Sequence, residues 1–167
     1  MREEDPVFVE VFARCFPRAA RVATRILGDP VAAEDIAAEA LARTFANWRS
    51  AQNYEHLDAW VLRITVNLAF DALRRRRRAR ALALPAPNPV LDSSTAEDML
   101  LLRESLRRLP RRQREAVVLC EYAGLTHGEV ASCMGVSVNT VSTHVRRGLM
   151  TLRELMGDKT EAPLWTT

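Results

Sequence analysis

Polar side chains near the C-terminal end of the sequence have the chemistry of a protein that reads duplex DNA. These residues are Asn139, Ser142, Thr143, Arg146 and Arg147. Asparagine can form two hydrogen bonds with adenine and arginine two with guanine, while serine and threonine bond to bases or phosphates. On a helix they point away from the apolar stripe of Val141, Val145, Leu149 and Leu152. We expect them to enter a DNA groove; the alternative is an ordinary solvated helix face.

A second set of side chains suits single-stranded nucleic acid and follows one edge of a segment in the middle of the chain. The set comprises Trp60, Arg63, Asn67, Phe70, Asp71 and Arg74, and it ends in the arginine run 74–78. Binding an unstacked strand requires a ring for stacking, an amide for a base edge and arginines for phosphates. Two alternatives remain open: Trp60 could belong to the core, and Arg63 could pair with an acid on a neighbouring helix.

The elements that position the first set carry strong local signals. Thr126 and Glu129 form a capping box ahead of a short helix, Gly135 ends that helix, and Ser137 caps the next one. This order predicts a helix, a tight turn and a second helix, which is the arrangement that places a helix in the major groove.

Helical signals also fill the N-terminal half of the chain. Pro6 and Pro17 are suited to open two successive helices, and a third helix is expected over 31–48, followed by a loop over 49–56. No strand-like alternation of any length occurs. The predicted fold is therefore all-α, with two small helical domains.

A linker separates the two predicted domains. The long helix that carries the second set starts at Leu57 or Asp58 and ends in the arginine run. The segment 81–94 then contains three prolines and little to bury. Fully stretched it reaches about 46 Å, so the two lobes need not touch. We predict a domain over 1–80, a flexible linker over 81–94, a domain over 95–158 and a tail over 159–167.

The charged residues are dominated by arginine. Of 24 basic residues in the 167-residue chain only Lys159 is a lysine, and the formal net charge is +3. A guanidinium binds phosphates and guanine edges and stacks on bases, so this excess favours a nucleic-acid partner. The alternative is codon bias in a GC-rich genome, which the many alanines also suggest.

Other classes of function find little support in the sequence. Cys15, Cys120 and Cys133 are an odd number without a CxxC pair, which argues against a disulfide framework and a zinc module. There is no phosphate-binding glycine loop, metal-ligand cluster or nucleophile beside a base, so we expect no enzyme, cofactor or metal. The start 1–6 is acidic and no stretch approaches the roughly 20 apolar residues of a membrane span, which predicts a cytoplasmic protein without membrane insertion.

Three blocks of the sequence, taken together, resemble the extracytoplasmic-function (ECF) sigma factors, the smallest class of bacterial RNA polymerase sigma subunits. The blocks are GDPVAAEDIAAEALARTF at 28–45, WVLRITVNLAFDALRRRRR at 60–78, and a third at 109–155 that begins LPRRQREAVVL and contains GVSVNTVSTHVRR. The first two resemble sigma region 2 and the third resembles region 4.

The resemblance implies two partners, core RNA polymerase and promoter DNA, with one set of residues for each contact. The β′ clamp helices would be bound by Asp35, Ile36, Glu39 and Leu41, and the β flap is a further contact on the polymerase. Single-stranded DNA of the −10 element would be bound by Trp60, Arg63, Asn67, Arg74 and Arg75, with the loop 49–56 as a pocket wall. Duplex DNA of the −35 element would be bound by Asn139, Thr140, Ser142, Thr143, Arg146 and Arg147. Family habit adds an anti-sigma factor that clasps both lobes.

The predicted function is that of a sigma factor, which directs core polymerase to promoters and helps to open the −10 region. The runner-up rests on the third block alone, which also resembles the LuxR-type helix-turn-helix of transcriptional regulators. In that interpretation the N-terminal lobe would be a sensing or receiver domain. A receiver domain needs alternating strands and helices, and the sequence lacks that pattern.

Overall fold

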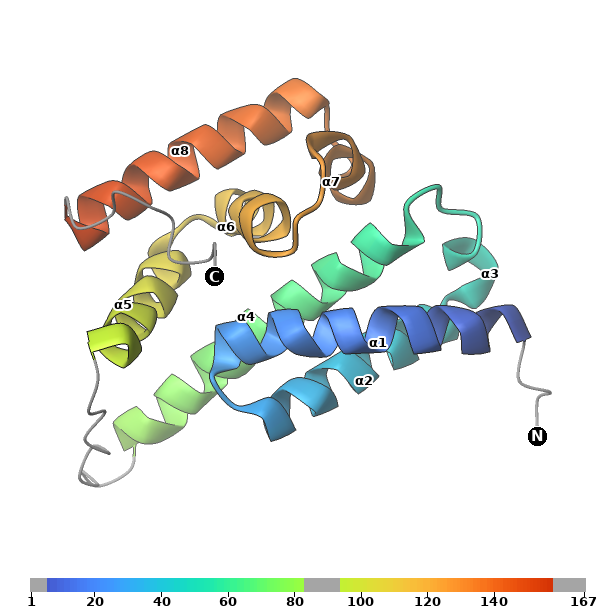
Figure 1. Ribbon diagram of the computed structural model, residues 1–167, viewed down its shortest axis with the longest axis horizontal. Helices are drawn as coiled ribbons and strands as arrows, with labels where there is room; N and C mark the ends of the chain where they lie inside the picture. The colour runs from blue at the N-terminus through green and yellow to red at the C-terminus, as the bar shows by residue number, and fades with distance from the viewer. Residues whose placement is uncertain (1–5, 83–93, 158–167) are drawn as a thin grey trace.

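The N-terminal lobe is a three-helix bundle. The computed structural model describes residues 6–82 and 94–157, and in the first range α1 (Pro6–Leu27), α2 (Pro30–Ala46) and α4 (Leu57–Leu82) pack against one another (Figure 1). One helical turn, α3 (Trp48–Ala51), follows α2, so part of the predicted loop 49–56 is helical. Across both described ranges the chain forms helices and turns without a strand, which confirms the all-α prediction.

Helix α1 passes through Pro17 without a break, so the prediction of two successive helices is wrong. Proline inside a helix removes one backbone donor and normally bends or ends the helix. Here the buried face continues on both sides of the exposed Pro17, with Val11 and Cys15 before it and Ala19 and Val22 after it. Packing of this face against α2 and α4 holds the helix together across the proline.

The second described range forms the C-terminal lobe. Its elements are α5 (Ser94–Arg108), α6 (Arg111–Val117), the π-helix η1 (Val118–Tyr122), α7 (His127–Met134) and α8 (Val138–Met156). The capping signals predicted for α7 and α8 are confirmed. The Thr126 hydroxyl accepts from the Glu129 backbone N–H at 3.2 Å, and the Glu129 carboxylate accepts from the Thr126 backbone N–H at 2.8 Å. Gly135 then ends α7 at a φ of 66°, and the Ser137 hydroxyl accepts from the first turn of α8.

A glycine brings α8 close to α6. Gly148 is buried, and a Cβ atom added there would lie 2.6 Å from Cγ2 of Val117. Val141, Val145 and Leu152 complete the buried side of α8. This side fixes how the opposite face of the helix is presented.

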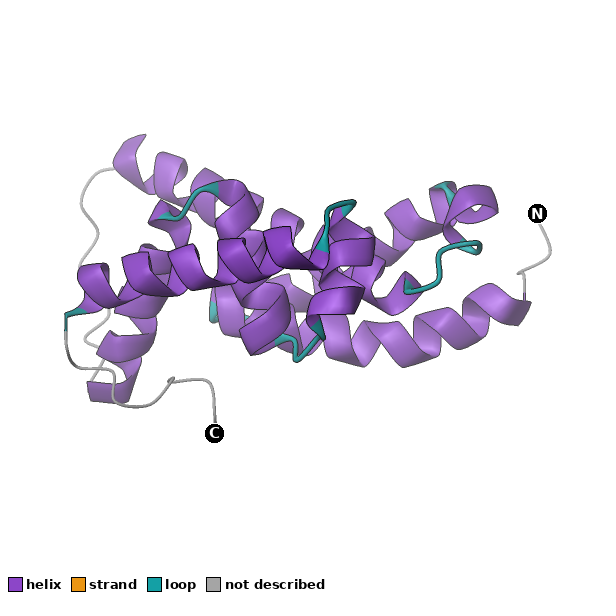
Figure 2. Cartoon of the chain, turned by 90° about the horizontal axis from the view of Figure 1, so that it is seen from above, coloured by secondary structure: helices purple, strands orange, loops and turns teal. Residues whose placement is uncertain are grey.

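The two lobes pack against each other, which the predicted linker did not require. Helix α4 contacts α1 and α2 on one side and α6, η1 and α7 on the other, and the helices of the two lobes lie against each other in both views (Figures 1 and 2). One cluster of buried apolar residues includes members of both lobes. The apolar surface of α4 extends around most of the helix, so it serves both lobes. Most of the predicted linker 81–94 and the whole tail 159–167 lie outside the described residues. Within the described ranges, no helix has the length and apolar character needed to cross a membrane.

Candidate nucleic-acid interface

The outer face of α8 is open to solvent. The side chains of Asn139, Arg146 and Arg147 are exposed and form no hydrogen bond or ion pair with any residue that the structure describes. Their donors are therefore available to an external acceptor such as a base edge or a phosphate.

Two threonines on the same helix have hydroxyls that are already engaged. The Thr140 hydroxyl lies 2.8 Å from the capping hydroxyl of Ser137, and the Thr143 hydroxyl donates to the Asn139 carbonyl at 2.9 Å. These bonds fix the side chains on the helix surface. A hydroxyl that donates within the helix can still accept a hydrogen bond from outside.

Two histidines, His127 on α7 and His144 on α8, have nitrogens that face the packing of these helices. Nδ1 of His127, at the start of α7, lies 3.1 Å from the Ser142 hydroxyl on α8. Nδ1 of His144 is buried and has no hydrogen-bond partner in the described part of the chain. No sequence signal could place His127 opposite Ser142, because this contact joins two helices across their packing.

Arg63, in contrast, lies against the C-terminal lobe. Its Nε donates to Oε2 of Glu115 at 3.3 Å and its Nη1 to the Cys133 carbonyl at 2.8 Å. Glu115 belongs to α6 and is only 1% exposed, and Cys133 belongs to α7. The structure therefore shows the alternative that the sequence left open, in which Arg63 pairs with an acid on a neighbouring helix.

Asn67 is occupied at both ends of its amide. Its Oδ1 accepts from Nε of Arg111 at 3.2 Å, and its Nδ2 donates to the Arg63 carbonyl at 3.0 Å. The same Nε of Arg111 donates to Glu115 at 2.9 Å. Asn67 thus belongs to a polar network that joins α4 to α6.

Phe70 was assigned to the polar edge by the sequence analysis, and this assignment is wrong. Its ring is 3% exposed and belongs to the core. The Arg114 guanidinium of α6 lies 4.5 Å from the ring centroid, a cation–π geometry. Burial lowers the pKa of Arg114, although the group remains charged at neutral pH.

Trp60 borders an open cavity of 280 Å³ that residues of both lobes line. The N-terminal lobe supplies Tyr54, His56, Trp60 and Arg63, and the C-terminal lobe supplies Ser132, Cys133, Met134 and Gly135. The rings of Tyr54 and Trp60 lie 5.3 Å apart. Two residues of the segment 49–56, expected to form a pocket wall, do line this cavity. The end of α7 forms the opposite wall.

The arginine run at the end of α4 is largely paired. Arg74 pairs with Asp71 on the same helix, Arg76 with Asp29 at 2.8 Å, and Arg77 with Glu104 at 2.9 Å. Arg75 is exposed and makes no ion pair with the residues in the described ranges. It is the member of the predicted −10 set whose charge is least compensated.

The predicted polymerase contact divides into exposed acids and buried aliphatic residues. Asp35 and Glu39 are exposed on α2, one turn apart, and Glu39 pairs with Arg43 at 2.7 Å. Leu41 is fully buried and Ile36 is 9% exposed. Ile36 and Leu41 therefore support the helix from the core and do not present their side chains to a partner.

The three cysteines have the properties of packed residues. Burial raises the pKa of Cys15 and Cys120 to about 12 and that of Cys133 to about 11. The thiols are free and protonated at neutral pH, which makes them weak nucleophiles. Over 6–82 and 94–157, no cluster of histidine, cysteine and acidic residues could hold a metal ion.

Comparison with known proteins assigns both lobes. The family model of sigma-70 region 2 matches residues 11–79, and that of sigma-70 region 4 matches residues 99–152. The RNA polymerase sigma-E factor of Streptomyces coelicolor is 32% identical over 136 residues, covering 80% of this chain and 77% of the relative. The sigma factor CarQ of Myxococcus xanthus is 33% identical and covers 90% of each chain. The ECF sigma factor SigE of Mycolicibacterium smegmatis is 36% identical and covers 90% of this chain and 62% of the relative.

Two solved structures share the fold. One is the sigma factor RpoE of Bartonella quintana in complex with the anti-sigma factor NepR, at 22% identity and a TM-score of 0.59, covering 93% of this chain and 99% of that one. The other is CnrH in complex with the cytosolic domain of CnrY, at 23% identity and a TM-score of 0.59, covering 89% of this chain and 86% of that one.

Proposed function

This chain belongs to the ECF family of bacterial RNA polymerase sigma factors, and from this premise we propose how its surfaces divide the reading of a promoter. As a sigma factor, it acts in transcription initiation with core RNA polymerase and promoter DNA. The matches to sigma regions 2 and 4, in that order, do not favour the LuxR-type alternative. Its place of action is the cytoplasm, where core polymerase meets DNA.

The C-terminal lobe reads the −35 element as duplex. The observation that carries this assignment is the open outer face of α8, where Asn139, Arg146 and Arg147 have no partner among the described residues. Thr140, Ser142 and Thr143 lie on the same helix with their hydroxyls fixed by short contacts, and they add contacts to bases or phosphates.

The N-terminal lobe holds the melted −10 strand. Trp60 and Asn67 supply a stacking ring and a base-reading amide, while Arg63, Arg74 and Arg75 neutralise phosphates. The cavity beside Trp60 is the place for a base that leaves the stack. The proposed boundaries remain 1–80 for this domain, 81–94 for the linker, 95–158 for the −35 domain and 159–167 for the tail.

Core polymerase binds the acidic face of α2 through Asp35 and Glu39, with Ile36 and Leu41 shaping the helix from behind. The β flap is the second contact, made by the C-terminal lobe. An anti-sigma factor is a further proposed partner, since one structural neighbour is a sigma factor solved in complex with an anti-sigma factor.

Reconstituted transcription on a promoter library tests the proposal. Core polymerase with this chain should initiate from a subset of templates that shares one sequence near −35 and another near −10. The chain with Arg146 and Arg147 changed to alanine should keep the −10 preference and lose much of the −35 preference. Initiation without any shared sequence, or the same preferences with core polymerase alone, would contradict the proposal.

A further inference from the structure

The hydroxyl of Ser142 is held by a residue of the neighbouring helix. Nδ1 of His127, the first residue of α7, lies 3.1 Å from the Ser142 hydroxyl on α8, and the two helices pack against each other (Figure 1). Thr143 differs, because its hydroxyl donates to a backbone carbonyl of its own helix. Among the described residues, the His127 ring is the one hydrogen-bond partner of the Ser142 side chain. The direction of this hydroxyl therefore depends on α7.

Ser142 lies on the face of α8 that is proposed to read DNA. Positions 139, 142, 143 and 146 follow the i, i+3, i+4, i+7 spacing of one helix face. Asn139 and Arg146 on this face are exposed, while Ser142 and Thr143 are half-buried. A hydroxyl in this place can contact the edge of a base in the major groove. Whether it donates or accepts a hydrogen bond decides which base it selects.

The two ring nitrogens of His127 have different surroundings. Nε2 has no partner in the described part of the chain, and the residue is exposed. Beside DNA the neighbours of Nε2 are water and phosphates, and a phosphate can only accept a hydrogen bond. In a neutral imidazole one nitrogen donates and the other accepts, so a proton on Nε2 leaves Nδ1 with its lone pair. The Ser142 hydroxyl then donates to Nδ1, and its oxygen presents only lone pairs to the DNA.

We infer that His127 is a positioning residue for the −35 element, which makes Ser142 select a base that presents an amino group. This inference rests on the proposed −35 function of α8. In the major groove the amino groups are N6 of adenine and N4 of cytosine, whereas guanine presents the acceptors N7 and O6 and thymine the acceptor O4. A serine without this contact can rotate its hydroxyl and donate as readily as it accepts. The contact with His127 thus converts a residue that tolerates several bases into one that discriminates between them.

The complex of core polymerase with the full chain, the holoenzyme, tests this inference on promoters that carry each base pair in turn at every −35 position. Ser142→Ala should lower the preference at one position by about two- to tenfold, the effect of one hydrogen bond. His127→Ala should lower the preference at the same position to a similar extent, and the double variant should be no worse than either single variant. His127→Asn should keep the preference, because its Oδ1 is an acceptor attached to Cγ, as Nδ1 is.

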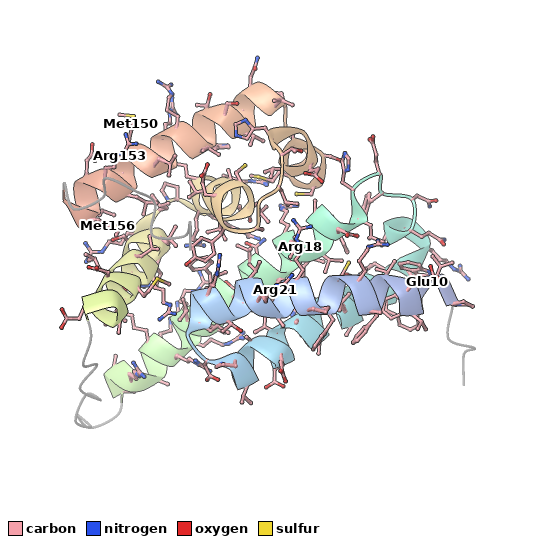
Figure 3. All side chains as sticks on the ribbon, viewed as in Figure 1. Glu10, Arg18, Arg21, Met150, Arg153 and Met156 are labelled. Atoms are coloured by element: carbon pink, nitrogen blue, oxygen red, sulfur yellow. The ribbon has the colours of Figure 1, made fainter. Side chains whose placement is uncertain are left out.

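Base analogues at that position identify the atom that is read. Purine in place of adenine, or 2-pyrimidinone in place of cytosine, removes the amino group and should weaken binding of the wild-type holoenzyme about two- to tenfold. The holoenzyme with Ser142→Ala should not respond to this change. Replacement of N7 by carbon in the purine of the same base pair should affect wild type and Ser142→Ala alike. The control is Met150→Ala, at an exposed position of α8 labelled in Figure 3, which should match wild type on every template.

Three results would overturn the inference. In the first, His127→Ala keeps the base preference or weakens all sequences alike, so the imidazole is only a packing contact. In the second, Ser142→Ala changes no −35 position. In the third, wild type does not respond to loss of the amino group, so the hydroxyl does not accept from it. In each case preferences at other −35 positions that depend on Arg146 or Arg147 leave the proposed function standing. A wild-type holoenzyme without any −35 preference rejects the proposed function and this inference with it.

Discussion

Two helices of this molecule carry the same kinds of side chain in opposite environments. Helix α4 presents Arg63 and Asn67 to the other lobe, where a carboxylate, a carbonyl and a guanidinium occupy them. Helix α8 presents Asn139 and Arg146 to solvent. Residue types therefore indicate what a surface can bind, while the distant partner decides whether that surface is available. Arg63 and Glu115 are 52 positions apart in the sequence, so no local pattern could reveal their contact.

The largest expected effect is loss of binding to core polymerase, on which promoter contacts of both helices depend. Changing Asp35 and Glu39 to arginine reverses the charge of the exposed face of α2 and should abolish co-purification with core polymerase. Circular dichroism should remain native, because both side chains are exposed. Glu10→Arg on α1, an exposed acid labelled in Figure 3, serves as the control and should leave co-purification intact. Retention of the double variant on core polymerase would reject the site.

Duplex binding by α8 should weaken directly when one of its exposed arginines is lost. Replacing Arg146 or Arg147 by alanine should cost about 1–3 kcal/mol and relax selectivity at one or two −35 positions if that side chain contacts a base. A phosphate contact should instead weaken all sequences alike and lower the salt slope by about one. Duplex binding at several salt concentrations distinguishes the two. An exposed α8 face that tolerates both changes without loss would not be a DNA reader.

Helix α4 should show its role at the −10 element through Asn67. Asn67→Ala should keep polymerase binding and −35 selection but lose discrimination at one −10 position, by about two- to tenfold for one hydrogen bond. The loss should persist on a pre-melted promoter, because the defect lies in reading an unpaired base. The measurement compares all four bases at each −10 position in the holoenzyme. Identical base preferences of variant and wild type would make Asn67 a residue of the lobe interface alone.

The smallest expected effect concerns α7, the helix that contacts both α4 and α8. Thr126→Ala removes one half of the capping box and should lower the free energy of unfolding by about 1 kcal/mol. Hydrogen bonds from the backbone and side chain of Thr126 lower the pKa of Glu129. The hydrogen bonds to the Glu129 carboxylate therefore stabilise the fold fully above the ordinary glutamate pKa. Their contribution is lost as the pH falls through the lowered pKa of Glu129. Urea unfolding at several pH values should show that the difference in free energy of unfolding between variant and wild type becomes smaller at acidic pH. A difference that does not change with pH would mean that the cap does not depend on ionised Glu129.

Local signals predicted much of the fold because they act within one turn of helix. The capping box at Thr126, the left-handed Gly135 and the cap at Ser137 are bonds between residues a few positions apart. Pro17 misled the prediction because a local preference was overridden by packing on both sides of it. The π-helix η1 gave no signal that the sequence analysis recognised.

The candidate site was predicted in its chemistry and only partly in its geometry. Asn139 and the arginines of α8 lie on the open face expected from the helical period. Ile36 and Leu41 are buried where a partner contact was expected, since a motif match does not distinguish a surface residue from one that supports it. For Arg63 the sequence offered a DNA contact and an ion pair as alternatives, and only the packing of the lobes shows which one exists in this form.

The close approach at Gly148 determines how closely α8, the helix proposed to read DNA, packs against α6. A methyl group there would meet Cγ2 of Val117 at 2.6 Å, so either the Val117 side chain or α8 itself would have to move. Arg146 and Arg147 immediately precede this point, and their reach into a groove depends on the same seating. The missing side chain on the buried side of α8 thus determines how far the side chains of its exposed face project. A larger residue at position 148 that still allows the chain to fold should change which DNA sequences the proposed −35 reader selects.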